Sequence, residues 1–341
     1  MPDTFEDIHI TQKMLKQISK ISFFRERFNN LPLERKWTEQ LHEQMTFMSV
    51  KSSLALENED VNITNVAEVP KLISDILKQR LLNELEIRKS FPIYFNTKDL
   101  SVEQVSYIHR FIDNVNDKIS QERGNYRKGQ KTSEAAYYKN ISKKLPRYGF
   151  LPRLVEEFVR HANESNIEEV ILSGLLYAEF ISISPFFRAN AQVARIISKG
   201  YLFTRGFDKF QILNIDSYFV EKQSKYYNAL KEYVDGNPTK WIELYLQAII
   251  KAFKYTSVQI EHISGRTIRP LANEVIHITE RQKTIVELLK KNSQMSGSEI
   301  AIILGVSRQN IFVIMQKLLK KKIVEKVGKG TTSRYRLKLA N

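Results

Sequence analysis

The sequence contains no cysteine, so disulfides, a thiolate nucleophile and thiolate metal ligands are excluded. The six histidines are scattered, and no two lie four residues apart, the spacing that places two imidazoles on one helical face. We therefore expect no metal site. Long apolar runs are also missing, because no stretch approaches the about 18 consecutive apolar residues of a membrane-spanning helix, and the first residues are polar and acidic. These absences predict a soluble, cytoplasmic protein without a membrane partner.

Positive charge is abundant and unevenly distributed. The net charge is +15 over 341 residues. Residues 279–341 contain 14 Lys and Arg against four Glu and no Asp, so that less than a fifth of the chain carries +10. A concentration of this kind is typical of a surface that binds a polyanion. Double-stranded DNA is the expected partner of this segment.

The same segment shows the local signals of three short helices. Capping boxes begin the first two, at 279–282 and 296–299, and Gly305 supplies the turn after the second. Ser307 is expected to cap the third, which runs from 308 to about 319. This order resembles the helix-turn-helix of DNA-binding proteins. The side chains expected to be buried are Ile300, Ala301, Ile303 and Leu304 in the second helix and Ile311, Ile314, Met315 and Leu318 in the third.

Two predicted strands, 323–327 and 335–339, follow the third helix and are joined by a basic, glycine-containing loop, as in the wing of a winged helix-turn-helix. If the third helix enters the major groove, its outer polar side chains would meet base edges and the wing would lie near phosphates. The alternative is that this module docks proteins or dimerises, which leaves a homodimer open. The charge favours DNA. The residues expected to contact it are Ser307, Arg308, Gln309, Asn310, Lys317, Lys326, Lys329, Arg334 and Arg336.

Residues 36–262 show helical periodicity almost throughout, which predicts a mainly α protein. Within them, residues 177–195 form an apolar helix, a proline-containing loop and the start of a second helix. A loop that ends at a helix N-terminus attracts anions, because unpaired amides and the positive end of the dipole point at the ligand. Arg195 adds a positive charge one turn further in. Phosphate is the expected guest.

This segment resembles the signature H-x-F-x-(D/E)-G-N-G-R-x-x-R of the Fic (Fido) family, whose members transfer AMP or a related group from a nucleotide to a protein hydroxyl. Further motifs follow in the order of the family: residues 124–127 are similar to G-x-(F/Y)-R, and 226–230 and 241–245 to its closing helices. The resemblance covers roughly residues 50–262 and implies an all-helical Fic-like core.

Residues 52–58 resemble the inhibitory motif of the same family, (S/T)-x-x-x-E-(G/N), with Ser53, Glu57 and Asn58 at its defining positions. The resemblance implies that Glu57 pairs with Arg195 and keeps the terminal phosphate of a nucleotide out of place. The alternative is that Ser53 and Glu57 simply share one polar face of a helix. The distance of this motif from the signature favours the inhibitory helix.

The positions that perform the chemistry differ from the family pattern. Ser184 stands at the place of the catalytic histidine, and a serine hydroxyl is no general base near neutral pH. Arg188 stands at the place of the acid that holds Mg²⁺, and a guanidinium cannot ligate a cation. No catalytic residue and no metal ligand is therefore expected.

Three further replacements lie beside them. Ala189 and Ala191 stand for the two glycines of the signature and disfavour positive φ, and Gln192 stands for its first arginine. Pro185 and Phe186 match the family. The side chains left to bind ATP or another nucleotide, without Mg²⁺, are Asn190, Arg195 and Arg188.

These observations favour a Fic-family pseudoenzyme coupled to a DNA-binding winged helix, acting as a transcriptional regulator or ligand sensor. A divergent Fic-type AMP transferase, with Glu179 or a target group as base, and a structural adaptor held by a permanent Glu57 to Arg195 salt bridge are the alternatives. The expected domains are an N-terminal helical region with the inhibitory helix around 40–58, a Fic-like core, a linker and the winged helix-turn-helix. Their respective ranges are 1–110, 111–263, 264–278 and 279–341.

Overall fold

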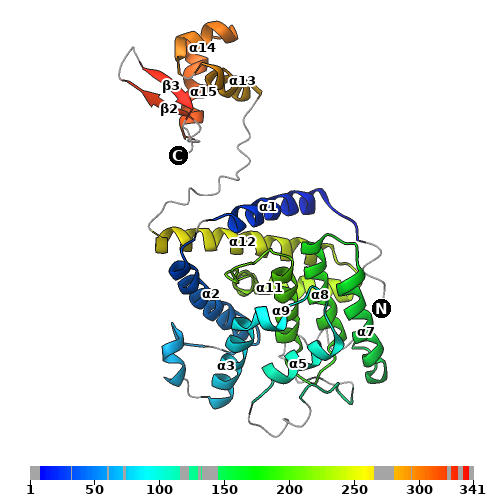
Figure 1. The fold of residues 1–341 in the computed structure, drawn as a ribbon. Coiled ribbons are helices and arrows are strands. Elements are labelled where there is room, and N and C mark those ends of the chain that lie inside the picture. Colours follow the sequence, from blue (N-terminus) through cyan, green and yellow to red (C-terminus); the bar gives the residue numbers. More distant parts are fainter. Residues whose placement is uncertain are drawn as a thin grey trace. The chain divides into compact units, whose positions relative to one another are not determined.

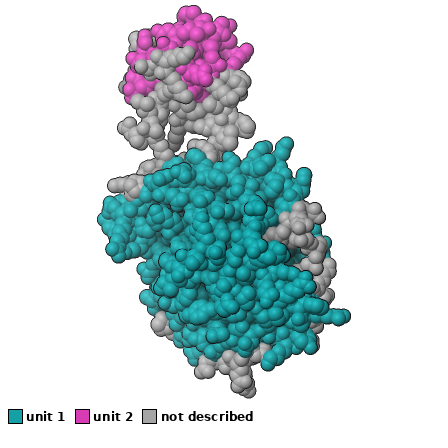
Figure 2. Space-filling view, turned by 45° about the vertical axis from the view of Figure 1, so that its right-hand side comes forward, with its two compact units in different colours: residues 1–270 teal, residues 271–341 magenta. Residues whose placement is uncertain are grey.

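The computed structural model describes residues 8–31, 33–59, 61–71, 74–115, 123–129, 132, 145–264, 280–292, 294–320, 324–328 and 333–337. The chain divides into two compact units, unit 1 at 1–270 and unit 2 at 271–341 (Figure 2). The linker expected at 264–278 lies outside the described residues except for Ser264, which ends a helix.

Unit 1 is helical in all of its described elements (Figure 1). Its α-helices are α1 (Gln12–Asn29), α2 (Arg35–Leu56), α3 (Asp75–Lys89), α4 (Phe91–Tyr94), α5 (Val102–Ile112), α7 (Leu151–Glu164), α8 (Glu169–Ile183), α9 (Asn190–Thr204), α10 (Asp216–Glu221), α11 (Gln223–Val234) and α12 (Thr239–Ser264). The 3-10 helices are η1 (Val66–Lys71) and η4 (Tyr148–Phe150). The mainly α prediction is confirmed. The boundary that we placed at residue 110 lies inside α5, so this helix belongs to both predicted segments.

The antiparallel pair α8 and α9 forms the centre of unit 1, with α5, α7, α11 and α12 packed around it and α1 lying along α12 (Figure 1). Nearly every side chain of α8 is buried, which fits its lack of a polar face. Gly174 permits this packing, because a Cβ atom there would lie 2.7 Å from the ring of Tyr245. Buried hydroxyls find partners: Tyr177 and Tyr226 are 2.7 Å apart between oxygens, and Ser173 and Tyr245 also 2.7 Å.

The C-terminal end of α2 explains why its motif requires Gly or Asn. Asn58 has φ 62°, in the left-handed region that Asn tolerates and most residues do not. This conformation lets the Asn58 amide donate to the Ala55 carbonyl at 3.1 Å and the Glu59 amide to the Leu54 carbonyl at 3.0 Å. The two bonds form a Schellman motif, which ends the helix at Leu56 and makes Glu57 its C-cap residue.

The described elements of unit 2 are α13 (Glu280–Lys291), β1 (Met295–Ser296), α14 (Gly297–Leu304), α15 (Arg308–Lys320), β2 (Val324–Val327) and β3 (Arg334–Leu337). Apart from β1, their order is the one expected from the sequence. The strands pair antiparallel in the order β1-β3-β2, and Tyr335 lies opposite both Met295 and Lys326. The two-residue strand β1 was not predicted, because it has no length over which to show a period.

Local signals of unit 2 are found where the sequence placed them. Ser296 and Glu299 form a reciprocal capping box, Gly305 takes φ 61° at the end of α14, and the Ser307 hydroxyl accepts from the Asn310 amide at 3.2 Å. Thr279 of the first capping box lies outside the described residues. The prediction for Ile303 was wrong, since it is 54% exposed. At 100° per residue, α14 turns positions 300, 301 and 304 inward and 303 away from them.

Within the described part of the chain, no single helix is long and apolar enough to cross a membrane. The pair α14 and α15 meets the length and composition requirements only when taken together, and it is bent by 115°. That angle lies in the range of helix-turn-helix motifs.

Candidate functional site

The candidate site is the loop 184–189 between α8 and α9, and a left-handed residue stands at each of its ends. Ser184, which ends α8, has φ 41°, and Ala189, which precedes α9, has φ 61°. Neither is glycine, so each costs on the order of 1 kcal/mol in backbone strain. Ala189 stands at the position of a glycine in the Fic signature, and it adopts the left-handed conformation that glycine tolerates without strain. Ala191 lies in the first turn of α9 and is free of this strain.

Ser184 performs a capping role in this loop. Its hydroxyl donates to the Ile181 carbonyl at 2.6 Å, and the residue is buried. The bond satisfies one of the carbonyls that remain unpaired at the C-terminus of a helix. The side chain that stands at the position of the catalytic histidine is thus turned back onto its own helix.

Arg127 holds the loop against two other segments. Its backbone amide donates to the Pro185 carbonyl at 2.9 Å and its Nε to the Ser184 carbonyl at 2.9 Å. Its remaining nitrogens donate to the carbonyls of Gly129 at 2.5 Å and Pro146 at 2.7 Å. The buried Arg127 guanidinium thereby joins three segments: the loop 184–189, the residues that follow Arg127 and the segment that leads into α7.

Asn190 closes the loop from the other side. Its amide oxygen accepts from the Phe186 backbone N–H, and its amide nitrogen donates to the Phe186 carbonyl, both at 2.9 Å. The Phe186 ring in turn stacks on His109, with 3.8 Å between centroids. Asn190 and Phe186 therefore give the loop its shape.

His109 is a buried neutral side chain that joins α5 to the loop. The Gly124 amide donates to its Nδ1 at 2.9 Å, which leaves the proton on Nε2, and Nε2 donates to the Arg188 carbonyl at 3.1 Å. Burial lowers its pKa to about 3, and the nearby Arg188 charge acts in the same direction. Both ring nitrogens are occupied, so this histidine supplies structure rather than a free base.

Arg188 lies in an ion pair that the sequence did not reveal. Its Nε lies 2.5 Å from Asp113 Oδ1, at the C-terminal end of α5, and both side chains are buried. The charge reversal at the metal position is therefore balanced by a carboxylate, 75 residues away in the chain. The charge that we expected to attract an anion is already neutralised.

Arg195, fully buried on α9, joins the signature to α2. Its Nε donates to the Ser53 hydroxyl at 2.8 Å, and one terminal nitrogen donates to Glu57 Oε1 at 2.7 Å and to the Ser53 carbonyl at 3.2 Å. The structure thus brings together the three side chains that the inhibitory motif implies. Tyr227 holds the same end of α2, because its hydroxyl donates to the Leu56 carbonyl at 2.9 Å.

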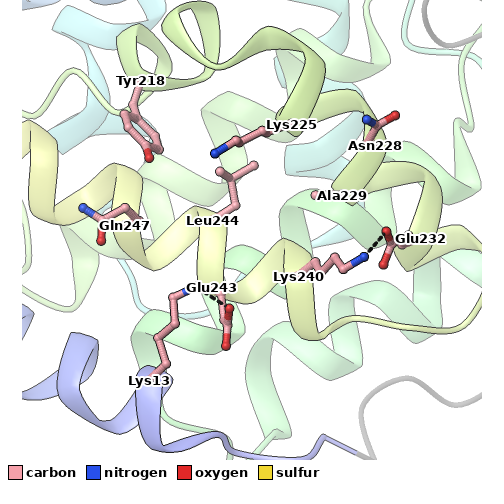
Figure 3. Close-up of a pocket in the computed structure, with 10 residues that line it drawn as sticks. All are labelled: Lys13, Tyr218, Lys225, Asn228, Ala229, Glu232, Lys240, Glu243, Leu244 and Gln247. Carbon is pink, nitrogen blue, oxygen red and sulfur yellow. Dashed lines mark hydrogen bonds and ion pairs between the residues drawn. The ribbon is translucent and has the colours of Figure 1, made fainter.

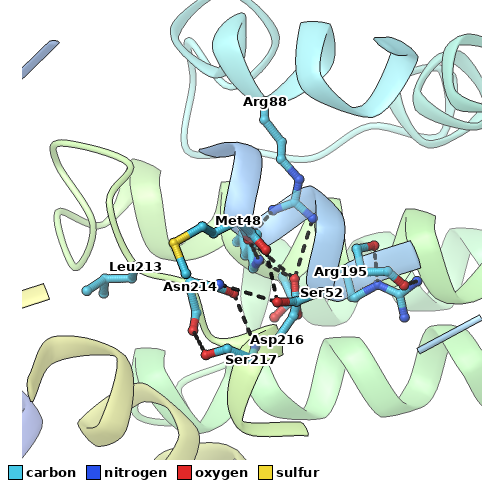
Figure 4. A network of polar contacts seen from close by, with 12 residues as sticks. Met48, Ser52, Arg88, Arg195, Leu213, Asn214, Asp216 and Ser217 are labelled. Atoms are coloured by element: carbon cyan, nitrogen blue, oxygen red, sulfur yellow. Dashed lines mark hydrogen bonds and ion pairs between the residues drawn. The ribbon is translucent and has the colours of Figure 1, made fainter. Parts of the chain in front are cut away.

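The contacts of Arg195 belong to a longer polar seam between α2 and α9 (Figure 4). Ser49 and Ser53 of α2 are one turn apart and lie opposite Lys199 and Arg195 of α9, which are also one turn apart. Lys199 also pairs with the buried carboxylate of Asp216 on α10. The helices therefore meet through hydrogen bonds as well as through apolar packing.

Four buried charges extend this seam towards α3 and α10. The Arg88 guanidinium lies 2.5 Å from Glu84 and 3.5 Å from Asp216, and Figure 4 shows it reaching down into the network. Burial, together with the charge of Arg88, lowers the pKa of Lys199 to about 8. Burial alone would raise the pKa of Asp216, but the charges of Lys199, Arg88 and Arg195 outweigh it and lower that pKa.

Gln192, at the place of the first arginine of the signature, ends in the same network. Its side-chain nitrogen donates to Glu84 Oε2 at 3.3 Å. An arginine here would add a third cation beside Arg88 and Lys199 in a buried region, whereas an amide adds a donor without charge. The replacement therefore suits its surroundings.

The other residues considered for catalysis are engaged elsewhere. Glu179, the alternative base, lies on α8. Its Oε1 lies 2.9 Å from Nδ1 of His161 on α7, within hydrogen-bond distance. Among the described residues, no three or more His, Asp and Glu side chains are grouped to hold a metal ion. The magnesium ion implied by the Fic resemblance does not fit this loop, because a paired guanidinium occupies the position of its ligand.

The residues expected to contact DNA are exposed in unit 2 wherever the structure describes them. Arg308, Gln309, Asn310 and Lys317 of α15 are exposed, and Ile311, Met315 and Leu318 are buried. At 100° per residue, Gln309 and Lys317 lie opposite the buried residues. Lys326 lies on β2, while Arg336 pairs with Glu325 at 2.6 Å and Arg334 with Glu299 at 3.4 Å. Lys329 falls outside the described residues.

Sequence reasoning missed two apolar side chains on α15 and several partners in unit 1. Phe312 and Val313 are exposed on α15, beside the polar residues. Asp113, Glu84 and Asp216 carry no motif of their own, and their roles depend on contacts between segments far apart in the sequence. A pattern that marks charged residues on otherwise apolar helix faces is the signal that would have selected Glu84.

Unit 1 is a helical bundle in which the loop 184–189 has a left-handed residue at each end and is followed by α9. These features define an all-helical Fic-type fold. Residues 99–202 match the family model described as Fic/DOC family, and the chain contains a Fic domain. No curated protein sequence matches the chain.

Three solved structures show the same fold. A Fic family protein from Desulfovibrio desulfuricans G20 superposes with a TM-score of 0.62 at 17% identity and covers 98% of each chain. Fic-1 (residues 134–508) from C. elegans gives a TM-score of 0.58 at 14% identity, over 74% of this chain and 73% of that one. A Fic domain containing signaling protein from Bacteroides thetaiotaomicron VPI-5482 gives 0.55 at 12% identity, over 75% of this chain and 100% of that one. At these identities the likeness establishes the fold alone.

Proposed function

We propose that this chain is a Fic-domain pseudoenzyme whose unit 2 binds double-stranded DNA, and that it acts as a transcriptional regulator. The DNA-binding part of the proposal rests on one observation about α15. Its polar residues Arg308, Gln309, Asn310 and Lys317 are all exposed. These are side-chain types that contact base edges and phosphates. A chromosomal partner agrees with the cytoplasmic location expected from the sequence.

The loop chemistry supports the pseudoenzyme part. A transferase of this type needs a proton acceptor and a cation holder at positions 184 and 188. The Ser184 hydroxyl donates a hydrogen bond to a helix carbonyl, and Arg188 carries a positive charge that Asp113 balances. Loss of general-base catalysis removes about 10²–10⁴ in rate, and loss of metal assistance several kcal/mol more.

The apolar side chains on α15 refine the DNA proposal. Val313 lies between Gln309 and Gln316 on the side of the helix opposite the core, and Phe312 flanks it. Glutamine pairs with adenine in the major groove, and an apolar side chain contacts the thymine methyl group. Sites that combine adenine and thymine are therefore the preferred targets.

Salt dependence of DNA binding tests the proposal. Fluorescence anisotropy with a labelled duplex should show an affinity that falls steeply as salt rises, because phosphate contacts release counterions. Lys317→Ala and Lys326→Ala should each reduce the slope of log K against log salt by about 1. Lys16→Ala, which removes an exposed lysine of unit 1, is the matched control and should leave the slope unchanged. Absence of binding at low salt, or an affinity that ignores salt, contradicts the proposal.

A structural adaptor is the second candidate, and the buried Arg195 to Glu57 contact favours it. A nucleotide phosphate that used Arg195 would first have to displace Glu57 and Ser53. If the pair is permanent, calorimetric titration with ATP gives no heat of binding with or without Mg²⁺. Heat that is present in the wild type and absent in Arg195→Ala would show instead that the pair opens for a nucleotide ligand.

A further inference from the structure

A pocket of about 360 Å³ lies among α1, α10, α11 and α12, away from the loop 184–189 (Figure 3). None of its lining residues belongs to the Fic signature, the inhibitory motif or the charged network. Its volume falls in the range of sites for small molecules. The lining residues are Lys13, Tyr218, Lys225, Asn228, Ala229, Glu232, Lys240, Glu243, Leu244 and Gln247.

Two of the three lysines in this pocket are neutralised by neighbouring carboxylates. Lys13 lies 2.5 Å from Glu243, and Lys240 lies 2.6 Å from Glu232, as Figure 3 shows. Lys225 has no such partner: among the described residues, no Asp or Glu oxygen lies within ion-pairing distance of its ammonium group. The five charged side chains therefore leave one positive charge, on Lys225.

The rest of the lining combines neutral polar groups with an apolar floor. Tyr218, Asn228 and Gln247 offer hydroxyl and amide groups, and Ala229 and Leu244 form an apolar area between α11 and α12. A ligand that complements this surface has an apolar body and one acidic group directed at Lys225. Figure 3 shows the end of the Lys225 side chain beside Leu244, so that one ligand can contact the ammonium group and the apolar floor together.

We propose that this pocket binds a small organic acid that carries a single carboxylate on an apolar body. A dianionic phosphate suits it less well, because the five charged side chains leave only one positive charge. Lys225 supplies the counter-ion to the carboxylate. This inference stands apart from DNA binding and from the loop chemistry.

Calorimetric titration of the full-length protein tests the site with three probes that share a phenyl ring: benzoate, phenyl phosphate and benzyl alcohol. Benzoate should bind in the millimolar range or tighter, and phenyl phosphate and benzyl alcohol about tenfold more weakly. Lys225→Ala should weaken benzoate binding about fivefold, and Lys225→Glu should abolish it, since reversal leaves an excess of negative charge. Lys225 is exposed, so neither change endangers folding.

Two further variants make the test specific. Lys231→Ala removes an exposed lysine of the same helix that does not line the pocket, and it should leave the affinity for benzoate unchanged. Leu244→Trp fills the apolar floor and should abolish binding while the charges stay in place. Equal benzoate affinity in Lys225→Glu, persistence of binding in Leu244→Trp, or no binding by the wild type overturns the proposal. Tighter binding of phenyl phosphate than of benzoate overturns the assignment to a monoanion.

Discussion

Arg188 lies against Asp113, and the Ser184 hydroxyl lies against the Ile181 carbonyl; both contacts are buried. Each substitution that removes a chemical group from the Fic signature is thus accommodated by a partner that satisfies the new side chain. Gln192 follows the same rule through Glu84. At the residue scale, each of these three replaced side chains is therefore held by a partner within the protein.

The Arg188 to Asp113 pair provides the first prediction. Arg188→Ala leaves the Asp113 carboxylate buried without its cation, so the free energy of unfolding should fall by about 3–5 kcal/mol. Combining it with Asp113→Asn should recover at least about 1 kcal/mol of that loss, which urea denaturation of the single and double variants measures. Arg153→Ala breaks an exposed pair with Glu157 and serves as the control, with an expected loss below about 1 kcal/mol. If Arg188→Ala costs no more than this control, the pair contributes nothing.

His109 provides a pH dependence of known sign. Its pKa of about 3 in the folded chain lies below the ordinary value of 6.5, so the unfolded chain takes up the proton first as the pH falls. The contribution of His109 to the free energy of unfolding is complete above pH 6.5 and is lost towards pH 3. The loss between pH 6.5 and pH 5 is about 2 kcal/mol.

Denaturation at the two pH values checks this, with His109→Gln as the comparison. The variant keeps polar groups for the backbone but does not titrate, so its loss of stability on acidification should be smaller by about 2 kcal/mol. Equal losses in the two proteins would show that folding does not lower the pKa of His109.

At the scale of elements, α2 is joined to α9 by a seam of buried polar contacts. The serines at 49 and 53 and the carboxylate at 57 recur every four residues, and they face Lys199 and Arg195. Directed contacts of this kind fix the register of the two helices more closely than apolar packing does, because each donor requires its own acceptor.

Removal of one carboxylate from this seam should loosen the end of α2. Glu57→Gln leaves the buried Arg195 without its carboxylate, and the amides of the last two turns of α2 should exchange with solvent at least about tenfold faster. Glu43→Gln changes an exposed residue of the same helix that forms no described ion pair, and it should have no effect. Hydrogen exchange with mass spectrometry distinguishes them; unchanged protection in Glu57→Gln would show that Glu57 does not hold the helix.

The contact between α2 and α9 was predicted in outline from the resemblance to the Fic family, which implied that Glu57 pairs with Arg195. Ser53, Glu57 and Arg195 do meet, although 138 to 142 residues separate Arg195 from the other two. The helices, the turn at Gly305 and the capping box at Ser296 were predicted from local signals, since each depends on neighbours within a few residues.

The pairings within the charged network could not be predicted, because nothing local indicates which charged residues meet. Asp113 and Arg188 are 75 residues apart, and Glu84 and Gln192 are 108 apart. Their pairing depends on how the helices pack, which no single period in the sequence records. The exposure of Ile303 escaped prediction because α14 is too short for its buried face to be defined by a pattern.

At the scale of the whole molecule, charge and chemistry are assigned to different segments. Residues 279–341 carry +10 of the net +15, while the Fic domain at 99–202 buries Arg188 beside Asp113 and Arg195 beside Glu57 of α2. The long helix α12 lines the proposed acid pocket near its start and ends at Ser264, before unit 2 begins at 271.

We infer that the Fic domain does not transfer a nucleotide. Incubation with labelled ATP, Mg²⁺ and candidate proteins tests this inference, with a Glu57→Gly variant beside the wild type to remove the contact with Arg195. We expect no label above background in either protein, because Ser184 offers no base and Arg188 holds no metal. Label transfer that Glu57→Gly enhances and Arg195→Ala abolishes would contradict it and make this domain a working transferase.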